Sequence, residues 1–347
     1  MLKVGIVGAN GYGGAELIRL LHNHPHVTLE LLVSNSTQGQ YIVDQYPHLH
    51  SIVELPLEKL DAEGVSNRVD VLFFATPSGV TKEIAPSFIE KGVPCIDLSG
   101  DFRLKDGSLY EQWYQQSPAD PEYLRQAVYG LPELYRERIK ESTFITNPGC
   151  YPTAAILGIM PALKTEIIDI NGPIIIDGKT GVSGAGRKPS QGIVFSEINE
   201  NTKAYKLASH QHTPEIEQII SDIHGQNIHL SFTAHIVPMT RGILCTTYLP
   251  LKKPLTDSEA VQLYQEIYQN EPFVRVRPKG ISPTTKEVYG TNYCDIGLAV
   301  DQRTNLLIVV SVIDNLVKGA AGQAIQNLNL LNNWDERTAL NVIPVYP

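Results

Sequence analysis

Short apolar runs and amphipathic stretches alternate along roughly the first hundred residues. Residues 3–7 and 27–33 are apolar runs of strand length, and residues 14–22 between them place apolar side chains at helical spacing. The same order returns further on, with strands predicted at residues 69–75 and 94–98 and a helix predicted between them at residues 81–91. Strands that alternate with helices in this way form a parallel sheet with helices on its faces. The pattern therefore predicts an α/β domain of Rossmann type, with a doubly wound parallel sheet.

Beyond residue 103 the pattern changes. Residues 104–142 are polar and rich in tyrosine and proline, which indicates loops and short helices, and they precede a strand at residues 143–146 and an apolar helix at residues 154–163. Strand-like runs then dominate, at residues 174–177, 230–236, 243–250, 273–276, 294–300 and 306–313, with one helical stretch at residues 258–268. Because regular crossovers are missing, these strands indicate a second, α+β domain with a mixed or antiparallel sheet.

A final helix is predicted at residues 315–331, and the small residues at its start permit close approach to another element. We expect this helix to return to the first domain and so make that domain discontinuous. A chain of 347 residues also exceeds the usual size of a single core. The expected division is a Rossmann domain of residues 1–149 plus 315–347, and a catalytic and oligomerisation domain of residues 150–314.

Composition and charge narrow the class of protein. Apolar residues make up 42% and charged residues 19% of the chain, which is typical of a globular protein, and no apolar run is long enough to span a bilayer. The net charge of −9 disfavours nucleic acid as a partner, because binding a phosphate backbone requires a basic face. The N-terminal residues show no leader, and the four cysteines form no CxxC pair. We therefore expect a cytoplasmic protein with neither a disulfide framework nor a zinc knot.

One cysteine stands where a reactive thiol is expected. The segment Asn147-Pro-Gly-Cys150-Tyr-Pro-Thr153 joins the strand at residues 143–146 to the helix that follows, so Cys150 lies near a helix N-terminus. The positive end of the helix dipole and the unpaired N–H groups there favour the nucleophilic thiolate. A buried structural cysteine is the alternative, since most free cysteines are buried and carry no chemistry.

A glycine-rich turn follows the first predicted strand and opens the first helix. Glycine at this junction lets the backbone bend sharply and lets a pyrophosphate approach the helix N-terminus. An ordinary tight turn is the alternative to a dinucleotide site. The residues expected to contact the cofactor lie in this turn and just after later strand ends: Gly8, Gly11, Tyr12, Gly14, Ser34, Ser36, Thr76, Pro77, Ser99 and Gly100.

The end of the second predicted strand bears on which dinucleotide binds. An NAD site usually has Asp or Glu there, and that charge would repel the 2′-phosphate of NADP. The segment Ser34-Asn35-Ser36-Thr37 offers hydroxyls and an amide without a carboxylate, although it also contains no arginine. NADP(H) is therefore favoured over NAD(H).

The densest polar cluster downstream of Cys150 is His210-Gln-His212-Thr213-Pro-Glu215. If this segment is extended, His210 and His212 point the same way, so that one imidazole can face the thiol while the other orients it or contacts substrate. Thr213 is a plausible N-cap, and Glu215 would lie in the first helical turn, where a purely structural role is an equal alternative to catalysis. Metal binding is disfavoured, because the pair has no cysteine partner and no HExxH pattern.

A thiolate beside a histidine, in a chain that binds a nicotinamide cofactor, indicates covalent hydride chemistry on an activated acyl group. The thiolate would form a thioester, and reduction of the thioester would release an aldehyde while histidine exchanges the proton. A small acyl phosphate is a good donor, and Arg103, Arg187 and Arg241 are candidates to bind its phosphate, unless each is only a solvated surface charge. The glycine-rich loop at residues 180–187 could add backbone N–H groups as an anion nest.

Five segments together resemble the N-acetyl-gamma-glutamyl-phosphate reductase family, and they span almost the whole chain. The segments are Gly8-Ala-Asn-Gly-Tyr-Gly-Gly14, Ser99-Gly-Asp-Phe-Arg103, Asn147-Pro-Gly-Cys-Tyr-Pro-Thr153, Gly181-Val-Ser-Gly-Ala-Gly-Arg187 and His210-Gln-His-Thr-Pro-Glu215. The resemblance implies an NADPH-dependent enzyme of arginine biosynthesis that reduces N-acetylglutamyl 5-phosphate to the 5-semialdehyde and releases phosphate. It also implies a fold similar to aspartate-semialdehyde dehydrogenase and a homotetramer or homodimer.

Residue roles follow from the same resemblance. Cys150 matches the nucleophile, and His212 matches its acid/base partner with His210 nearby, although the choice between the two histidines stays open. Ser183 is expected to contact substrate. Gly184 and Asn315 are expected to contact the cofactor, Asn315 from the head of the last helix on the nicotinamide side.

Two other functions stay open at this point. A relative that acts on a carrier-bound aminoadipyl phosphate in lysine biosynthesis would share the thiol, the fold and the cofactor, because fold and motif do not fix the substrate. A regulatory protein that senses NADP without turnover would have no need for a thiol at a helix start.

Overall fold

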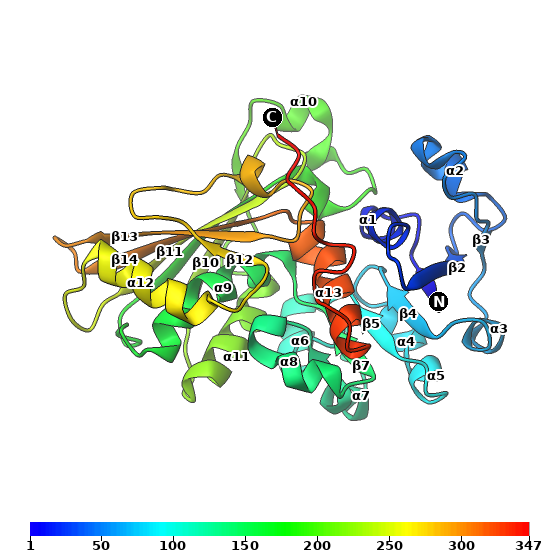
Figure 1. Cartoon of the computed structure of the whole chain (residues 1–347), viewed down its shortest axis with the longest axis horizontal. Helices are drawn as coiled ribbons and strands as arrows, with labels where there is room; N and C mark the ends of the chain where they lie inside the picture. The colour runs from blue at the N-terminus through cyan, green and yellow to red at the C-terminus, as the bar shows by residue number, and fades with distance from the viewer. Residues whose placement is uncertain (347) are drawn as a thin grey trace. The chain divides into compact units, whose positions relative to one another are not determined.

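The structure, a computed structural model, describes residues 1–346 and divides them into two compact units (Figure 1). Of these described residues, the first unit consists of Met1–Gly149 and Ala320–Val342, and the second consists of Cys150–Gly319 and residues 343–346. The chain thus returns to the first unit at Ala320, whereas the sequence pattern placed the return at residue 315. The junction between Gly149 and Cys150 lies at the start of the predicted apolar helix.

A seven-stranded parallel sheet forms the centre of the first unit, in the order β3-β2-β1-β4-β5-β7-β6. Its strands are β1 (Leu2–Val7), β2 (Val27–Val33), β3 (Leu57–Glu58), β4 (Val71–Phe74), β5 (Cys95–Asp97), β6 (Val128–Tyr129) and β7 (Phe144–Thr146). The chain starts in the middle of the sheet and winds outward in both directions. The loops after β1, β2 and β4 therefore meet at the carboxyl edge, where open parallel sheets bind ligands.

Helices connect these strands and complete the first unit. They are α1 (Tyr12–Leu21), α2 (Ile42–Gln45), α3 (Ala62–Ser66), α4 (Thr81–Ile84), α5 (Pro86–Ile89), α6 (Gly107–Tyr114), α7 (Pro121–Gln126), α8 (Pro132–Lys140) and α13 (Gly322–Leu331). The returning helix α13 contacts β5, α1 and α8. The single helix predicted at residues 81–91 is divided into α4 and α5, and Pro86, which has no N–H to continue the ladder, begins the second. The strands β3 and β6 were not predicted, because two-residue strands carry no detectable alternation.

The second unit contains a seven-stranded mixed sheet, in the order β12-β13-β14-β11-β8-β10-β9. Its strands are β8 (Ile174–Thr180), β9 (Lys203–Tyr205), β10 (Leu230–Ile236), β11 (Ile243–Pro250), β12 (Val274–Val276), β13 (Cys294–Asp301) and β14 (Leu306–Ile313). Two pairs, β10 with β8 and β12 with β13, are parallel, and the other pairs are antiparallel. The two sheets together confirm the predicted combination of a doubly wound Rossmann-type domain and a mixed α+β domain.

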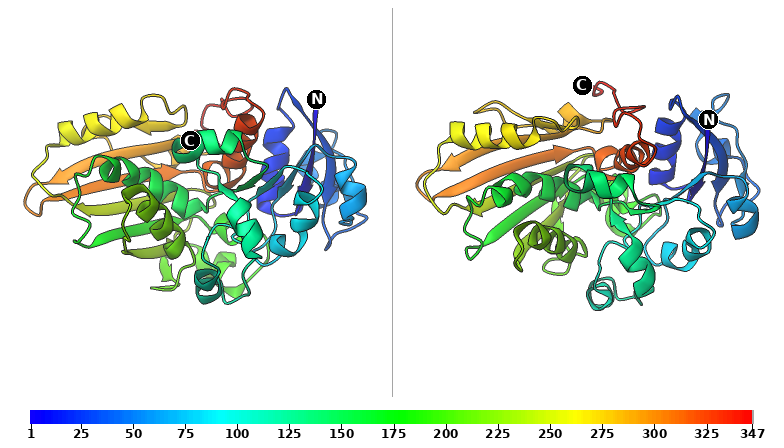
Figure 2. Two further views of the ribbon diagram at one scale, coloured as in Figure 1. Left: turned by 90° about the horizontal axis from the view of Figure 1, so that it is seen from below. Right: turned by 60° about the horizontal axis from the view of Figure 1, so that its bottom comes forward.

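The helices of the second unit are α9 (Cys150–Lys164), α10 (Phe195–Ile198), α11 (His212–His224) and α12 (Asp257–Tyr268). The apolar helix α9 packs across β11 and β14, with α11 and α12 beside it, and Figure 2 shows α12 (yellow) running along the long strands. Along β11, buried and half-buried residues alternate, as expected for a strand covered on one face.

The last predicted helix, at residues 315–331, differs from the structure at its start. A turn of π-helix, η5 (Val317–Ala321), comes first, and the α-helix α13 begins only at Gly322. Short 3₁₀ turns occur in both units: η1 (Pro47–Leu49), η2 (Val182–Ala185), η3 (Gln191–Ile193) and η4 (Thr285–Val288). None of the helices within residues 1–346 combines the length and the apolar character of a membrane span.

Candidate active site

Cys150 is the first residue of α9, a helix of 15 residues. Its side chain is partly exposed, whereas Cys95, Cys245 and Cys294 are buried. Burial raises the pKa of the Cys95 and Cys245 thiols, so neither forms a thiolate near neutral pH. Of the four cysteines, only Cys150 thus combines access to a ligand with a helix N-terminus that favours the thiolate.

Three aromatic rings contact the ring of Tyr151, the residue that follows Cys150. The Tyr151 ring meets the His210 ring edge-on at a centroid distance of 5.7 Å and the His212 ring at 6.1 Å. The Tyr151 hydroxyl donates to the carbonyl oxygen of His235 at 3.2 Å, and the ring also contacts Phe232. Burial and a hydrogen bond with Tyr205 raise the pKa of Tyr151, which therefore stays a neutral phenol. The rigid Tyr151 ring thus links the helix that begins at Cys150 to the histidine pair.

The two histidines differ in what their ring nitrogens do. His210 Nδ1 accepts a hydrogen bond from the backbone N–H of His212 at 3.1 Å, and its Nε2 lies 3.4 Å from the Tyr205 hydroxyl. Burial, with a smaller contribution from Lys206, lowers the pKa of His210 to about 4. His210 is therefore a neutral ring that satisfies one of the first N–H groups of α11, rather than a group that exchanges protons near neutral pH.

The helix that follows His210 begins at an earlier residue than the sequence predicted. The helix α11 begins at His212, after Gln211 in the αR region, so the two imidazoles do not alternate along an extended strand. Their centroids nevertheless lie 4.8 Å apart. Thr213 lies inside the first turn and is not the N-cap. That position is Gln211, whose side chain makes no capping hydrogen bond, and the His210 ring accepts from the N–H of His212 instead. Pro214 is accommodated because the first N–H groups of a helix need no intrahelical partner.

Glu215 lies in the first turn of α11 and is fully buried. The position at the positive end of the helix dipole stabilises a carboxylate. The structure thus gives Glu215 the helical placement predicted from the sequence.

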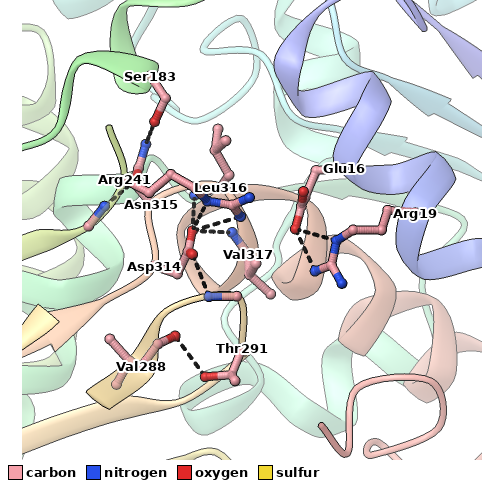
Figure 3. Close-up of polar contacts among 12 residues, drawn as sticks. Glu16, Arg19, Ser183, Arg241, Val288, Thr291, Asp314, Asn315, Leu316 and Val317 are labelled. Carbon is pink, nitrogen blue, oxygen red and sulfur yellow. Dashed lines mark hydrogen bonds and ion pairs between the residues drawn. The ribbon is translucent and has the colours of Figure 1, made fainter. Parts of the chain in front are cut away.

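The three predicted substrate-binding arginines lie in different environments. The guanidinium of Arg103 is buried and donates to the carbonyl oxygens of Leu98 and Asn147, each at 2.8 Å. Arg241 forms an ion pair with the buried carboxylate of Asp314 at 3.0 Å, as Figure 3 shows. Only Arg187 is exposed, on the loop after η2. Arg103 and Arg241 therefore hold protein groups in place through these contacts.

A hydrogen bond joins the side chains of Ser183 and Asn315. The Asn315 amide donates to the Ser183 hydroxyl at 3.0 Å and accepts from the backbone N–H of Gly242 at 2.7 Å (Figure 3). Asn315 lies ahead of the π-helical turn and not at the head of an α-helix as predicted. Gly184, next to Ser183 in the 3₁₀ turn η2, is exposed.

The glycines of the turn after β1 differ in whether the fold requires glycine at their positions. Gly8 adopts a φ of +87°, and an added Cβ would lie 2.4 Å from the Ala75 carbonyl oxygen. A Cβ on Gly14 would lie 2.5 Å from the Gly8 carbonyl oxygen. Gly11, the N-cap of α1, is different, because an added Cβ there would meet only one atom, at 3.5 Å. The fold itself does not need glycine at position 11, which is the arrangement expected if a pyrophosphate approaches the helix N-terminus. Tyr12, the first residue of α1, is 37% exposed.

Hydroxyl groups gather at the end of β2. Ser34 accepts a hydrogen bond from Thr37 at 2.8 Å, and Ser36 accepts one from the Asn10 amide at 3.0 Å, while the two serine oxygens lie 3.4 Å apart. The sequence predicted Ser34 and Ser36 in this place but did not pair them with Asn10 of the glycine-rich turn. Within the first unit, the turns after β1 and β2 thus form one polar surface.

The predicted cofactor contacts after β4 and β5 also come together. The Thr76 hydroxyl, next to Pro77, lies 2.6 Å from that of Thr81, and Ser99 donates to the carboxylate of Asp97. The N–H of Gly100 donates to the Ser78 hydroxyl at 3.2 Å, which joins the two loops.

Three buried aspartates in these regions were missed from the sequence. Asp101 accepts hydrogen bonds from the N–H groups of Gly79 and Lys82 and so fixes the loop that contains Thr76 and Pro77. Asp97 and Asp314 are also fully buried. Asp97 ends β5 and Asp314 directly follows β14, so a carboxylate at the end of an apolar run was the available signal. Among residues 1–346, no group of His, Cys, Asp and Glu side chains has the arrangement of a metal site.

Two family models match the chain and define its class. Residues 3–142 match the NAD-binding domain of semialdehyde dehydrogenases, and residues 150–315 match the semialdehyde dehydrogenase dimerisation domain. Solved structures share the fold: aspartate semialdehyde dehydrogenase II from Vibrio cholerae, complexed with ASA, is 17% identical with a TM-score of 0.72, over 96% of this chain and 98% of that one. The Candida albicans enzyme with NADP, also 17% identical, has a TM-score of 0.69 over 96% and 98% of the two chains. The protein is therefore a semialdehyde dehydrogenase in the broad sense.

Relatives with much higher identity narrow this class. The N-acetyl-gamma-glutamyl-phosphate reductases of Geobacillus kaustophilus (strain HTA426) and Bacillus subtilis (strain 168) are 53% and 49% identical over 346 residues, in each case 100% of both chains. The chain belongs to the N-acetyl-gamma-glutamyl-phosphate reductase family. The resemblance read from the five sequence segments is thereby confirmed, as are an enzyme function and a nicotinamide dinucleotide cofactor.

Proposed function

We propose that this chain reduces N-acetyl-L-glutamyl 5-phosphate to N-acetyl-L-glutamate 5-semialdehyde, with NADPH as reductant and release of phosphate, in arginine biosynthesis. The observation that carries the mechanism is the position of Cys150, a partly exposed thiol at the first residue of a long helix, while the other three cysteines are buried. The full-length relatives carry the acetylglutamyl name, so the aminoadipyl substrate is not retained.

Cys150 supplies the covalent step. Its thiolate attacks the acyl carbon, and the bond from that carbon to the phosphate oxygen breaks with its electron pair on the departing phosphate. The product is a thioester on the Cys150 sulfur. When bound, the reduced nicotinamide supplies the hydride that converts the thioester to a thiohemiacetal.

We assign the proton to His212 rather than to His210. His210 Nδ1 is committed to the N–H of His212, and burial lowers the pKa of His210 to about 4, so near neutral pH this ring is neutral and has no imidazolium proton to donate. The His212 imidazole protonates the substrate oxygen as the hydride adds. It takes that proton back when the carbon–sulfur bond breaks, which frees the aldehyde and returns the Cys150 thiolate. His210 and Tyr151 position the His212 ring, and Glu215 supports the first turn of α11.

The cofactor is held by the residues around the glycine-rich turn. Gly8 and Gly14 shape the turn, while Gly11 leaves room beside the N-terminus of α1 for the pyrophosphate. Tyr12, Thr76, Pro77, Ser99 and Gly100 border the same sheet edge of the first unit. The contacts of Gly184 and Asn315 with the cofactor remain predictions from the sequence. The hydroxyls of Ser34 and Ser36 suit a 2′-phosphate, which favours NADP(H) over NAD(H).

The substrate phosphate is assigned to the loop after η2. Arg187 is exposed, and its guanidinium offers a planar cationic fork for the phosphate. The N–H groups of Ser183 and Gly184 already donate to the carbonyl oxygens of Thr240 and Gly181, so they form no anion nest. Arg103 and Arg241 act indirectly, because their guanidinium groups hold the turn before Cys150 and the carboxylate of Asp314. The homotetramer or homodimer and the cytoplasmic location remain predictions from the sequence.

The test is an assay in the reverse direction, with N-acetylglutamate 5-semialdehyde, phosphate and either NADP or NAD, followed by absorbance of the reduced nicotinamide. We expect phosphate-dependent reduction that is faster with NADP. Cys150→Ser lowers kcat at least about 1000-fold. Cys95→Ser, the same change at a buried cysteine on β5, retains turnover and serves as the matched control. Phosphate-independent turnover, or full activity in Cys150→Ser, contradicts the proposal.

A further inference from the structure

A turn of π-helix is the least regular element of the second unit that touches the candidate active site. The turn, η5 (Val317–Ala321), lies between β14 and α13 in the chain. Single π-turns are rare and occur frequently at functional sites, because the extra residue costs hydrogen-bond geometry that a regular helix would keep. A local reason is therefore expected for this one.

The contact of Gly319 with Cys150 supplies that reason. An added Cβ on Gly319 would lie 2.8 Å from Cys150 Cβ and 3.2 Å from Cys150 Cα. The backbone of the π-turn thus lies directly against the residue that carries the nucleophile, and only glycine permits this approach.

Asp314 holds the turn in this position. Its Oδ1 accepts from the N–H groups of Leu316 at 2.9 Å and Val317 at 3.2 Å (Figure 3). Its main-chain oxygen accepts from the N–H of Gly319 at 3.0 Å. The carboxylate is fully buried, and the guanidinium of Arg241 compensates its charge at 3.0 Å.

The second carboxylate oxygen fixes a separate loop. Oδ2 of Asp314 accepts from the N–H of Gly290 at 2.7 Å. Both oxygens therefore face N–H donors. An asparagine at this position would direct its own NH₂ group at one of these donors, so Asp314→Asn cannot keep the complete set of bonds.

We propose that Asp314 and Gly319 are positioning residues for the reaction: Asp314 anchors the π-turn, and the bare Cα of Gly319 sets the position of Cys150 at the start of α9. The proposal rests on the proposed role of Cys150 as nucleophile. Neither residue touches the substrate. Each acts through the sulfur atom, and a displacement of about 1 Å of a reacting group costs on the order of 100-fold in rate.

The experiment compares wild type, Gly319→Ala and Asp314→Asn with Gly192→Ala as the matched control. A Cβ on Gly192, which is half-exposed in η3, would meet only the flexible Lys203 ammonium, at 3.2 Å. Circular dichroism and thermal melting first establish that each variant is folded. Two measurements follow: the rate at which iodoacetamide alkylates Cys150, located by peptide mass spectrometry, and kcat with KM for the cofactor and the semialdehyde.

In Gly319→Ala the Cβ contact must lengthen from 2.8 Å to at least the 3.4 Å of ordinary contact. We expect kcat about 100-fold lower, KM for the cofactor unchanged, and alkylation of Cys150 at least threefold slower than in wild type. Asp314→Asn shows smaller losses of the same kind, and Gly192→Ala matches wild type in both measurements.

A folded Gly319→Ala variant with wild-type kcat and wild-type alkylation overturns the proposal. If Gly319→Ala does not fold, Asp314→Asn decides by the same criteria. The alkylation rate reports on the position of the Cys150 thiol without any turnover. Failure of the positioning proposal therefore shows as unchanged alkylation in Gly319→Ala, whereas failure of the proposed function shows as retained turnover in Cys150→Ser.

Discussion

The turn before Cys150 depends on one buried amide, and replacing it gives a measurable loss. Asn147 is fully buried, and its side chain makes two hydrogen bonds within the first unit. The amide nitrogen donates to the carbonyl oxygen of Ala320 at 3.0 Å, and the amide oxygen accepts from Asn327 at 3.1 Å. The main-chain bonds of Asn147 with Asp97 and Arg103 do not involve the side chain and persist in Asn147→Ala.

The magnitude follows from these contacts. Each lost hydrogen bond contributes about 0.5–1.5 kcal/mol net, and the buried Asn327 donor keeps its second partner, the carbonyl oxygen of Gly130. With a small cavity added, Asn147→Ala should lower the free energy of unfolding by about 2–3 kcal/mol. Since Cys150 follows three residues later, kcat should also fall at least about tenfold.

The assay is urea unfolding followed by circular dichroism, together with the reductase assay. Asn23→Ala removes an exposed amide of the first unit that donates one hydrogen bond, to the Arg19 carbonyl oxygen at 3.3 Å, and it should change stability by less than about 0.5 kcal/mol. If Asn147→Ala has both the stability and the kcat of wild type, the bonds described here do not hold the turn, and the reasoning is refuted.

An isosteric variant tests the same contacts by pH. Asn147→Asp places a carboxyl oxygen against the Ala320 carbonyl oxygen, so burial should raise the pKa of the introduced carboxyl in the folded state. Its folded pKa then exceeds the unfolded value of about 3.9, and stability is retained at low pH and lost as pH rises through the folded pKa. Unfolding at pH 5 and pH 8 measures this, and equal stability at both contradicts it.

Three further predictions concern the glycines, the histidines and a buried carboxyl. Gly8→Ala should prevent stable folding of the first unit, because φ is +87° and the added Cβ would clash with backbone at 2.4 Å, which calorimetry checks. Gly11→Ala should keep the wild-type melting temperature but raise the dissociation constant of the cofactor at least about tenfold, which fluorescence titration checks. His212→Asn should lower kcat by about 100-fold or more. His210→Asn can still accept the hydrogen bond from the His212 N–H, so it should keep more activity and the wild-type pH profile of kcat between pH 6 and 9. Equal losses of kcat in the two variants would contradict the assignment of the proton to His212. Burial, and then the charge of Asp101, raises the pKa of Asp97 to about 7, so wild-type stability should fall relative to Asp97→Asn as pH rises from 4 to 7 and then level off; a constant difference in urea unfolding would contradict it.

Much of the fold follows from the alternation of side chains along the chain. Strands β2, β10, β11 and β14 have the bounds that the apolar runs predicted, because strands of seven or eight residues with one covered face carry a clear signal. The two-residue strands β3 and β6 carry none, since their pairing is imposed by neighbouring strands and not by their own side chains.

The candidate site likewise contains features that the sequence predicts and features that it does not. By itself, the sequence determined the glycine-rich turn, the cysteine at a helix start and the histidine pair, because each depends on local backbone geometry and residue type. Only the tertiary structure decided that the His210 ring accepts from the N–H of His212, that Arg103 and Arg241 hold protein groups, and that Gly319 lies against Cys150. Most of these contacts join residues that are distant in sequence, and the burial and hydrogen bonding that fix their roles exist only once each sheet and its own helices have packed.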